Sequence, residues 1–377
     1  MSEVLELCCE LIRRESLTPQ DDGCQDLIAE RLVALGFNVE SLPAGGVSNL
    51  WATHGNSGPL LVFAGHTDVV PVGSLDRWTN PPFEPTITGD WLYGRGACDM
   101  KSGVASMILA IERFVEQNPQ HQGILGVLLT SDEEGIATHG TKYVMQIFNE
   151  RNINIDWCVV GEPSSSTTLG DTIRVGRRGS LSGTLSAKGT IGHVAYPELT
   201  PNVVHELVAP LKTLAQKKWD QGNKHFQPTT FQISNIHAGT GADNVIPGEL
   251  EVQFNFRFNT EHTPESLKQT VVEALSAVNP KVHTDITWWN SGLPFLSQQG
   301  ILTQTTIDVV QDVTGCSPKQ STGGGTSDAR FIVPTGTETV ELGHLNVTAH
   351  KYDERVLVED LEVLAQVYER IIGRLLR

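Results

Sequence analysis

The sequence has no apolar run long enough to cross a membrane, since none reaches the ~18 residues that a spanning helix requires. It is also short of positive charge: 27 Lys and Arg residues stand against 44 Asp and Glu residues, giving a formal net charge of −17 at pH 7. This balance argues against nucleic acid or an anionic membrane as a partner. An anionic substrate would need a local cluster of arginines to overcome it.

The six cysteines show no spacing of a redox motif or a disulfide framework, because no two of them form a C-x-x-C pair. We interpret them as small buried hydrophobic residues in a reducing compartment. Residues 1–16 mix Glu and Arg with apolar residues, which is typical of an amphipathic helix and not of a signal peptide. These features predict a cytoplasmic protein.

Strands and helices alternate in the first half of the chain. Runs rich in Val, Ile and Leu predict buried strands over 60–65, 123–130 and 156–161, and helical periodicity predicts helices over 101–118 and 139–150. Such alternation favours an α/β fold with a mainly parallel central sheet flanked by helices. The same pattern returns near the C-terminus, where helices are expected over about 301–313 and 359–376.

Between these parts, apolar and polar residues alternate as they do in half-exposed antiparallel strands. Four such strands are expected, over 180–188, 229–237, 249–259 and 282–289. Two helices are expected between them, one over 201–218 and one starting at Thr263. A chain of 377 residues also exceeds the usual size of one domain. We therefore predict a catalytic domain over 1–179 and 294–377, interrupted by an α+β domain over 180–293.

Four acidic or histidine residues lie where an apolar or aromatic run breaks into a polar tip with glycine nearby: His66, Asp99, Glu134 and Glu162. Strands of an open α/β sheet end in this way, and ligands bind outside their carboxyl ends. Together with His350, these residues look like the complete ligand set of a two-metal hydrolytic site.

The charges of this set support a pair of metal ions. Three carboxylates, two neutral imidazoles and a bridging hydroxide would neutralise two divalent cations, which a partly buried site favours. Nitrogen and oxygen ligands without thiolate suit Zn²⁺, with Co²⁺ or Mn²⁺ as substitutes. Two ions ~3.5–4 Å apart need a bridging carboxylate. Asp99 is the best candidate, because its short side chain holds its position most rigidly.

Glu133 and Glu134 are chain neighbours, so their side chains point in different directions and one can bind metal while the other faces the substrate. A free carboxylate beside activated water is a general base that later returns the proton to a leaving amine. The set therefore indicates an amide hydrolase. Taken singly, each residue has an ordinary alternative: a solvated Glu-Glu loop, a surface histidine, or Asp99 as a helix cap.

Four motifs resemble those of the co-catalytic zinc aminoacylase/carboxypeptidase superfamily: GHTDVVP at 65–71, YGRGACDMK at 93–101, TSDEE at 130–134 and GEPS at 161–164. Four further stretches are similar to the desuccinylases of bacterial lysine and cell-wall precursor synthesis within it, at 176–180, 192–197, 235–241 and 322–331. The resemblance spans essentially the whole chain. It implies a zinc-exopeptidase-like catalytic domain and an inserted dimerisation domain of four antiparallel strands and two helices.

The resemblance also implies two Zn²⁺ ions per subunit, with Co²⁺ as a possible substitute and Asp99 as the bridge. It sorts the other ligands into two pairs, His66 with Glu162 and Glu134 with His350, and makes Glu133 the general base. The peptide between Asp99 and Met100 is expected to be cis, a form that non-proline bonds adopt rarely.

Two further residues receive catalytic roles from the resemblance. Asp68 would hold the His66 ring as a carboxylate behind the metal ligand and set its tautomer. In a homodimer, His193 would reach into the partner's active site and help to stabilise the tetrahedral oxyanion.

The implied reaction is the cleavage by water of the amide of N-succinyl-L,L-diaminopimelate, which gives succinate and L,L-diaminopimelate. Arg178 and Arg257 would pair with the substrate's carboxylates, because guanidinium suits carboxylate geometry. Hydrogen bonds would come from Tyr196, Asn244, and Gly324 and Thr326 of the glycine-rich loop. Arg257 could instead be a surface residue, and the loop merely a tight turn.

Three residues depart from the superfamily's commonest pattern: Cys98, Ser102 and His344. Cys98 could be a stray soft ligand beside the bridge, but we favour simple steric tolerance. His344 competes with His350 as the last ligand, and the context of residues 348–351 favours His350.

Two other functions remain open. The nearer is another amidohydrolase of the superfamily, such as an acetylornithine deacetylase or a dipeptidase. The more distant is a non-catalytic two-domain protein that closes on an amino acid, and the intact Glu133 counts against it.

Overall fold

The structure is a computed structural model, and it describes residues 2–377. Contacts within the chain separate two units. Unit 1 comprises Met1–Gly176, Leu296–Ser321 and Ser327–Arg377, and unit 2 comprises Arg177–Phe295 and Thr322–Thr326. Unit 2 is an insertion in the chain of unit 1, and it also takes the short loop 322–326, which we had expected within the catalytic domain.

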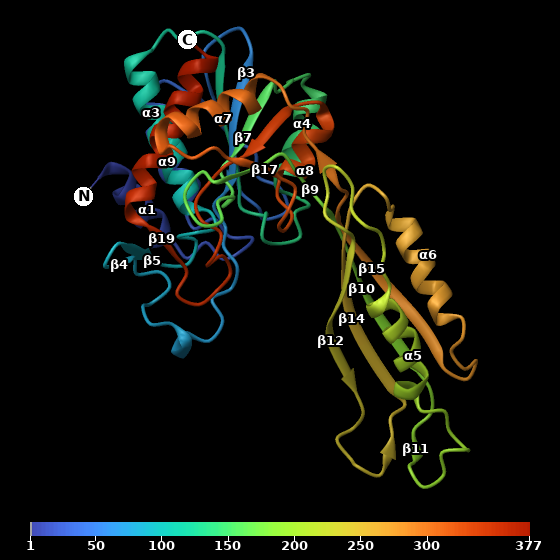
Figure 1. Ribbon diagram of the computed structural model, residues 1–377. Coiled ribbons are helices and arrows are strands. Elements are labelled where there is room, and N and C mark those ends of the chain that lie inside the picture. The colour runs from blue at the N-terminus through green and yellow to red at the C-terminus, as the bar shows by residue number, and fades with distance from the viewer. Residues whose placement is uncertain (1) are drawn as a thin grey trace. The chain divides into compact units, whose positions relative to one another are not determined.

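Unit 1 is built on an eight-stranded sheet in the order β1-β2-β6-β3-β7-β18-β8-β17. Figure 1 labels three of these strands, β3, β7 and β17. The strands are β1 (Asn38–Ser41), β2 (Asn49–His54), β3 (Leu60–His66), β6 (Ile124–Thr130), β7 (Trp157–Val160), β8 (Thr172–Arg174), β17 (Lys319–Ser321) and β18 (Glu338–Glu341). The four central strands β6, β3, β7 and β18 run parallel to one another, whereas β2 beside β6 and β8 beside β18 are antiparallel to them. This confirms the predicted mainly parallel sheet.

Seven helices belong to unit 1 in the described chain: α1 (Glu3–Ile12), α2 (Cys24–Ala34), α3 (Lys101–Gln117), α4 (Thr141–Glu150), α7 (Ile301–Thr314), α8 (Ala329–Ile332) and α9 (Val358–Leu375). Helix α9 packs against α3, α7 and α1 (Figure 1). Phe63 of β3 meets Tyr368 of α9 edge-on, with ring centroids 5.4 Å apart. Burying each such side chain stabilises the fold by about 1.5–3 kcal/mol.

Shorter elements complete unit 1. Strands β4 (Thr86–Thr88), β5 (Trp91–Tyr93) and β19 (Arg355–Leu357) form a three-stranded sheet, and η1 (Leu75–Arg77) and η2 (Val333–Thr335) are single 3-10 turns. Strands β9 (Gly176–Arg177) and β16 (Phe295–Leu296) lie where the chain passes from one unit to the other. No helix within residues 2–377 is both long and apolar enough to cross a membrane.

Unit 2 contains a four-stranded antiparallel sheet in the order β12-β14-β10-β15. Its strands are β10 (Gly179–Lys188), β12 (Thr230–Ala238), β14 (Glu249–Phe258) and β15 (His283–Gly292). Helices α5 (Val203–Gln216) and α6 (Pro264–Leu275) pack their buried leucines and Val271 against the apolar side of this sheet. Alternate residues of β14 are buried, as the sequence pattern predicts.

Two local features of unit 2 position residues discussed below. Strands β11 (Gly192–His193) and β13 (Val245–Ile246) form a separate two-stranded ladder. Helix α6 begins with a capping box, because Thr263 Oγ1 accepts the N–H of Ser266 (3.2 Å) and Ser266 Oγ accepts the N–H of Thr263 (3.1 Å). Thr263 therefore caps this helix as predicted.

Candidate metal centre

Three of the predicted metal ligands follow neighbouring parallel strands. His66 is the last residue of β3, Glu134 lies four residues beyond the end of β6, and Glu162 lies two residues beyond β7. Because β6, β3 and β7 are adjacent and parallel, their carboxyl ends share one edge of the sheet. The topology thus delivers these three side chains to one place.

The other two ligands come from loops. Asp99 lies between β5 and α3, and His350 lies between β18 and β19 with a positive φ of 62°. The Asp99–Met100 peptide is cis, as predicted.

The five side chains converge around Asp99. His66 Nε2 lies 3.3 Å from Asp99 Oδ1 and 3.5 Å from Glu162 Oε1. His350 Nε2 lies 3.4 Å from Asp99 Oδ2 and 2.8 Å from Glu134 Oε1. Each oxygen of Asp99 therefore faces a different imidazole, each with its own glutamate. This is the arrangement that a bridging carboxylate between two metal ions requires.

The electrostatics of the cluster favour cations. Burial tends to lower the pKa of His66, but the carboxylates of Asp68 and Asp99 raise it well above the usual value. Hydrogen bonds to Asp99 and Glu134 raise the pKa of His350 to about 10. The carboxylates thus draw protons onto both imidazoles, and divalent ions compete for the same nitrogens. The donor set, which contains no thiolate, fits two borderline metal ions.

Glu133 occupies a different environment from Glu134. It lies in a group with His66 and Glu162 whose potential ligand atoms are all within 4.8 Å of one another, and its Oε1 is 3.9 Å from Arg330 Nη1. Burial, and next the negative charge of Asp328, raise the pKa of Glu133 to about 8. A carboxylate with a raised pKa beside the ligand cluster has the properties of a general base.

Asp68 holds the His66 ring mainly through its main-chain oxygen, whereas the sequence had led us to expect its carboxylate in this role. His66 Nδ1 lies 2.9 Å from the main-chain oxygen of Asp68 and 3.5 Å from its carboxylate, so the carbonyl is the nearer acceptor. The carboxylate instead accepts the N–H groups of Glu133 (3.4 Å) and Glu134 (3.2 Å). Asp68 thus holds both the imidazole and the loop of the two glutamates.

Sequence reasoning missed Glu354, which is 1% exposed and shapes the Asp99 loop. Its carboxylate accepts the N–H groups of Gly96 (3.1 Å), Cys98 (2.8 Å) and Asp99 (2.9 Å), and pairs with Arg95 Nη1 at 2.7 Å. A charged acceptor for three backbone donors fixes the loop that presents the bridging carboxylate. No local pattern around residue 354 indicates this role.

Asp328, also missed, lies close enough to Glu133 to influence its pKa. It is 3% exposed, and its Oδ2 accepts the Thr141 hydroxyl at 2.6 Å. The sequence could have indicated Asp328, because it lies within residues 322–331, one of the stretches that carry the family resemblance.

Two of the departures from the superfamily pattern, Cys98 and His344, do not disturb the ligand set. The Cys98 thiol donates to the carbonyl of Leu345 (3.0 Å), and burial raises its pKa, so it remains a thiol bonded to the main chain. His344 is 1% exposed, and burial lowers its pKa to about 3. His350, not His344, stands beside Glu134 and Asp99, as we had preferred.

All the predicted substrate-binding residues, and His193, belong to unit 2. His193 and Tyr196 are exposed, and their ring centroids lie 5.6 Å apart. The main-chain oxygen of Asn244 accepts the N–H of Val194 at 3.2 Å, which joins the Asn244 segment to the His193 segment. These three residues form one group, beyond the Lys188 end of β10.

The remaining residues form a second group at the other end of β10. Arg178 precedes the strand directly, and Arg257 pairs with Ser180 in the ladder. Arg177 donates to the main-chain oxygen of Gly325 (3.3 Å), which brings the loop of Gly324 and Thr326 to this end. The 10 residues of β10 span roughly 33 Å at ~3.3 Å per residue, so the two groups are well separated within one chain.

The chain is similar to known proteins over nearly its whole length. The sequence profile described as peptidase family M20/M25/M40 matches residues 62–374. A Methylococcus capsulatus protein named succinyl-diaminopimelate desuccinylase is 54% identical over 376 residues, which cover 100% of this chain and 99% of that relative. A Thioalkalivibrio sulfidiphilus protein of the same name is 52% identical, with 100% of both chains covered.

Solved structures show the same fold. An M20 family metallo-carboxypeptidase from Sulfolobus solfataricus matches with a TM-score of 0.82 at 18% identity, covering 99% of both chains. A Bacillus subtilis protein described as a dinuclear metal-binding peptidase of the M20 family matches with a TM-score of 0.71 at 16% identity, covering 99% of this chain and 97% of that one. At these identities the likeness supports the fold alone.

Proposed function

The chain belongs to peptidase family M20/M25/M40, and from this membership and the ligand cluster around Asp99 we propose its reaction. It is a hydrolase that cleaves the amide bond of N-succinyl-L,L-diaminopimelate to succinate and L,L-diaminopimelate, a step of bacterial lysine and diaminopimelate biosynthesis. The main support for this function is that relatives named succinyl-diaminopimelate desuccinylase are 52–54% identical to the chain over nearly its whole length.

We assign two zinc ions to the cluster, with cobalt as a substitute. His66 and Glu162 would hold one ion, Glu134 and His350 the other, and Asp99 both, in keeping with the distances from each imidazole to its neighbouring carboxylates. Bound in this way, the ions would polarise the amide carbonyl and make a water molecule more acidic.

Glu133 would take the proton of the attacking water and later deliver it to the leaving amine. Its position beside His66 and Glu162 supports this transfer, and burial raises its pKa, which makes the carboxylate a stronger base. A carboxylate positioned beside the attacking water can accept its proton in one step and return it in the next. Asp328 and Arg330 would set this balance through their opposite charges.

The substrate carboxylates would bind at the Arg178 group of unit 2. Arg178 donates one N–H to the Pro228 carbonyl (2.8 Å), while its buried Nε finds no hydrogen-bond partner within residues 2–377. A carboxylate would satisfy that donor, and pairing with guanidinium suits its geometry. Arg257, Gly324 and Thr326 would complete this end of the substrate site.

We further propose a homodimer formed through unit 2. The roughly 33 Å length of β10 separates the Arg178 group from the His193 group, so one copy of unit 2 cannot place both on one small substrate. His193, Tyr196 and Asn244 would instead serve the partner's site, where His193 would stabilise the oxyanion. We place the enzyme in the cytoplasm, where its six unpaired cysteines stay reduced.

A metal-reconstituted assay tests the function. The zinc-loaded protein should hydrolyse N-succinyl-L,L-diaminopimelate with a kcat/KM at least ~100-fold above that for N-acetylornithine. Glu133→Gln is the matched control, because it removes the base and keeps every ligand. A preference for the acetylated substrate or for a dipeptide would move the chain to another activity of the same family.

A further inference from the structure

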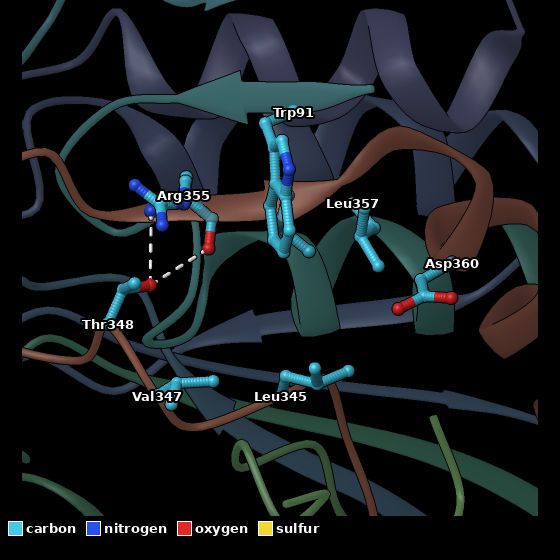
Figure 2. A pocket seen from close by; sticks show the side chains of 8 residues that line it. Trp91, Leu345, Val347, Thr348, Arg355, Leu357 and Asp360 are labelled. Carbon is cyan, nitrogen blue, oxygen red and sulfur yellow. Dashed lines mark hydrogen bonds between the residues drawn. The ribbon is translucent and has the colours of Figure 1, made fainter. Parts of the chain in front are cut away.

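A small, partly open cavity lies in unit 1, and none of its lining residues is a predicted metal ligand or substrate-binding residue. Its volume is about 150 Å³. The indole of Trp91 and the side chains of Leu345, Val347 and Leu357 form apolar walls (Figure 2). A cavity of this size can hold a ligand as large as benzene, since an engineered cavity of ~150 Å³ does so.

One acidic side chain interrupts these walls. Asp360, in the first turn of α9, lines the cavity and is 8% exposed. Its Oδ2 is buried and has no hydrogen-bond partner among the described residues. Burial raises the pKa of this carboxyl to about 6, so it is ionised at pH 7.5. A buried acceptor without a partner costs free energy, which a donor in the cavity would recover.

Within residues 2–377, Arg355 is the only basic residue that lines the cavity, and its guanidinium contacts aromatic rings and not Asp360. Trp91 stands between Arg355 and Asp360 in Figure 2. The Arg355 guanidinium lies over the rings of Trp91, at 5.1 Å, and Tyr93, at 5.5 Å. No ion pair joins Arg355 to Asp360, so the carboxylate keeps its negative charge unbalanced by the cavity lining.

We propose that this cavity binds a short alkylammonium ion, with the ammonium on Asp360 and the alkyl chain between Trp91, Leu345 and Leu357. An ammonium supplies both a donor and an opposite charge, and such pairs are stronger than neutral hydrogen bonds. The alkyl chain gains from leaving water, at about 0.8 kcal/mol per CH₂. A chain of about four carbons matches the cavity size.

The cavity also adjoins the loop that carries His350. The Thr348 hydroxyl donates to the main-chain oxygen of Arg355 (2.9 Å) and accepts the N–H of the same residue (3.2 Å), as Figure 2 shows in part. These bonds close the base of the segment 348–355. A ligand in the cavity would therefore lie against the base of the loop that holds a proposed metal ligand.

Isothermal titration calorimetry of the zinc-loaded protein with butylammonium chloride at pH 7.5 tests the proposal without any need for turnover. We expect saturable binding that Asp360→Asn weakens at least tenfold. Glu359→Gln removes one exposed negative charge next in the chain and should leave the affinity within twofold. Binding at the metal centre would be the same in all three proteins. Equal affinity of wild type and Asp360→Asn, or no saturable binding to the wild type, would overturn the proposal.

A ligand series covers the case in which Asp360→Asn fails to fold. The wild type should bind butylammonium at least tenfold more tightly than 1-butanol, which keeps the shape and a donor but carries no charge. Butyrate, with the opposite charge, should not compete with butylammonium for this cavity. If 1-butanol binds as well as butylammonium, or a soaked crystal shows the ammonium away from Asp360, recognition by this carboxylate is wrong.

Discussion

Glu133 and Glu134 are neighbours in the chain, yet their side chains have different surroundings. Glu134 lies 2.8 Å from His350 Nε2, whereas Glu133 lies 3.9 Å from Arg330 Nη1. We predict that Glu133→Gln keeps both metal ions and lowers kcat at least ~100-fold, because an amide cannot accept the proton of water. Metal analysis and steady-state kinetics on the same sample check this. Near-normal turnover would remove Glu133 from the role of base.

Glu354 offers a second test at the residue scale. It accepts three backbone N–H groups around Asp99 and pairs with Arg95, all in a buried environment. We predict that Glu354→Gln destabilises the protein by about 2–4 kcal/mol and weakens metal binding, because Arg95 loses its partner and the loop one charged acceptor.

Chemical denaturation and zinc titration measure these two effects. Asp353→Asn is the control, since Asp353 only accepts bonds from exposed Thr79 and should change stability by less than about 1 kcal/mol. Loss of stability with unchanged zinc affinity would mean that Glu354 supports the fold but does not position Asp99.

Replacing Asp360 should increase the stability of the protein, in contrast to replacing Glu354. Burial raises the pKa of its carboxyl from 3.8 to about 6, so the charged form disfavours the native state at neutral pH. The first turn of a helix favours a negative charge by about 0.3–1 kcal/mol, which offsets part of that cost. We predict that Asp360→Asn stabilises the protein by about 1 kcal/mol at pH 7.5.

The pH dependence follows from the raised pKa. Lowering the pH through about 6 protonates the native carboxyl before the unfolded one, so the wild type regains stability. The difference between Asp360→Asn and wild type should therefore vanish near pH 4. Chemical denaturation at pH 7.5 and at pH 4 measures this difference in stability. A variant that is less stable than wild type at pH 7.5 would contradict the prediction.

At the scale of elements, what the sequence could predict depended on how local the signal was. His66 and Glu162 were found because each follows a buried strand, and parallel neighbours bring their carboxyl ends together. Glu354 was missed because its partner Asp99 lies 255 residues away, and only the folded chain joins them. The choice of the Asp68 carbonyl over its carboxylate depends on a side-chain rotation that residue types do not encode.

Helix α6 provides an element-scale prediction. Thr263 and Ser266 cap each other's backbone at its start. Thr263→Ala should destabilise unit 2 by about 1 kcal/mol, because it leaves the N–H of Ser266 without its acceptor. Thr270→Ala is a matched control on the same helix, where the exposed hydroxyl donates only to the Ser266 carbonyl. Thermal melts should show a loss for the first variant and none for the second.

At the scale of the whole molecule, the sequence places the change of pattern near residues 177–180, and unit 2 begins at Arg177. The pattern did not indicate that residues 322–326 join unit 2, because a glycine-rich loop carries no periodicity to assign it. That loop brings Gly324 and Thr326 to the Arg178 end of β10. The two ends of this strand divide the predicted substrate residues into groups that one small substrate cannot touch together.

This division makes a prediction about assembly. If His193 serves the partner's active site, a heterodimer of Glu133→Gln with His193→Ala should contain one complete site, built from the intact Glu133 of one subunit and the intact His193 of the other. Random pairing makes half of all dimers mixed, so two inactive variants combined in equal amounts should recover about a quarter of wild-type activity. Subunit exchange is verified with differently tagged chains. Exchange without recovered activity would mean that His193 acts within its own subunit or not at all.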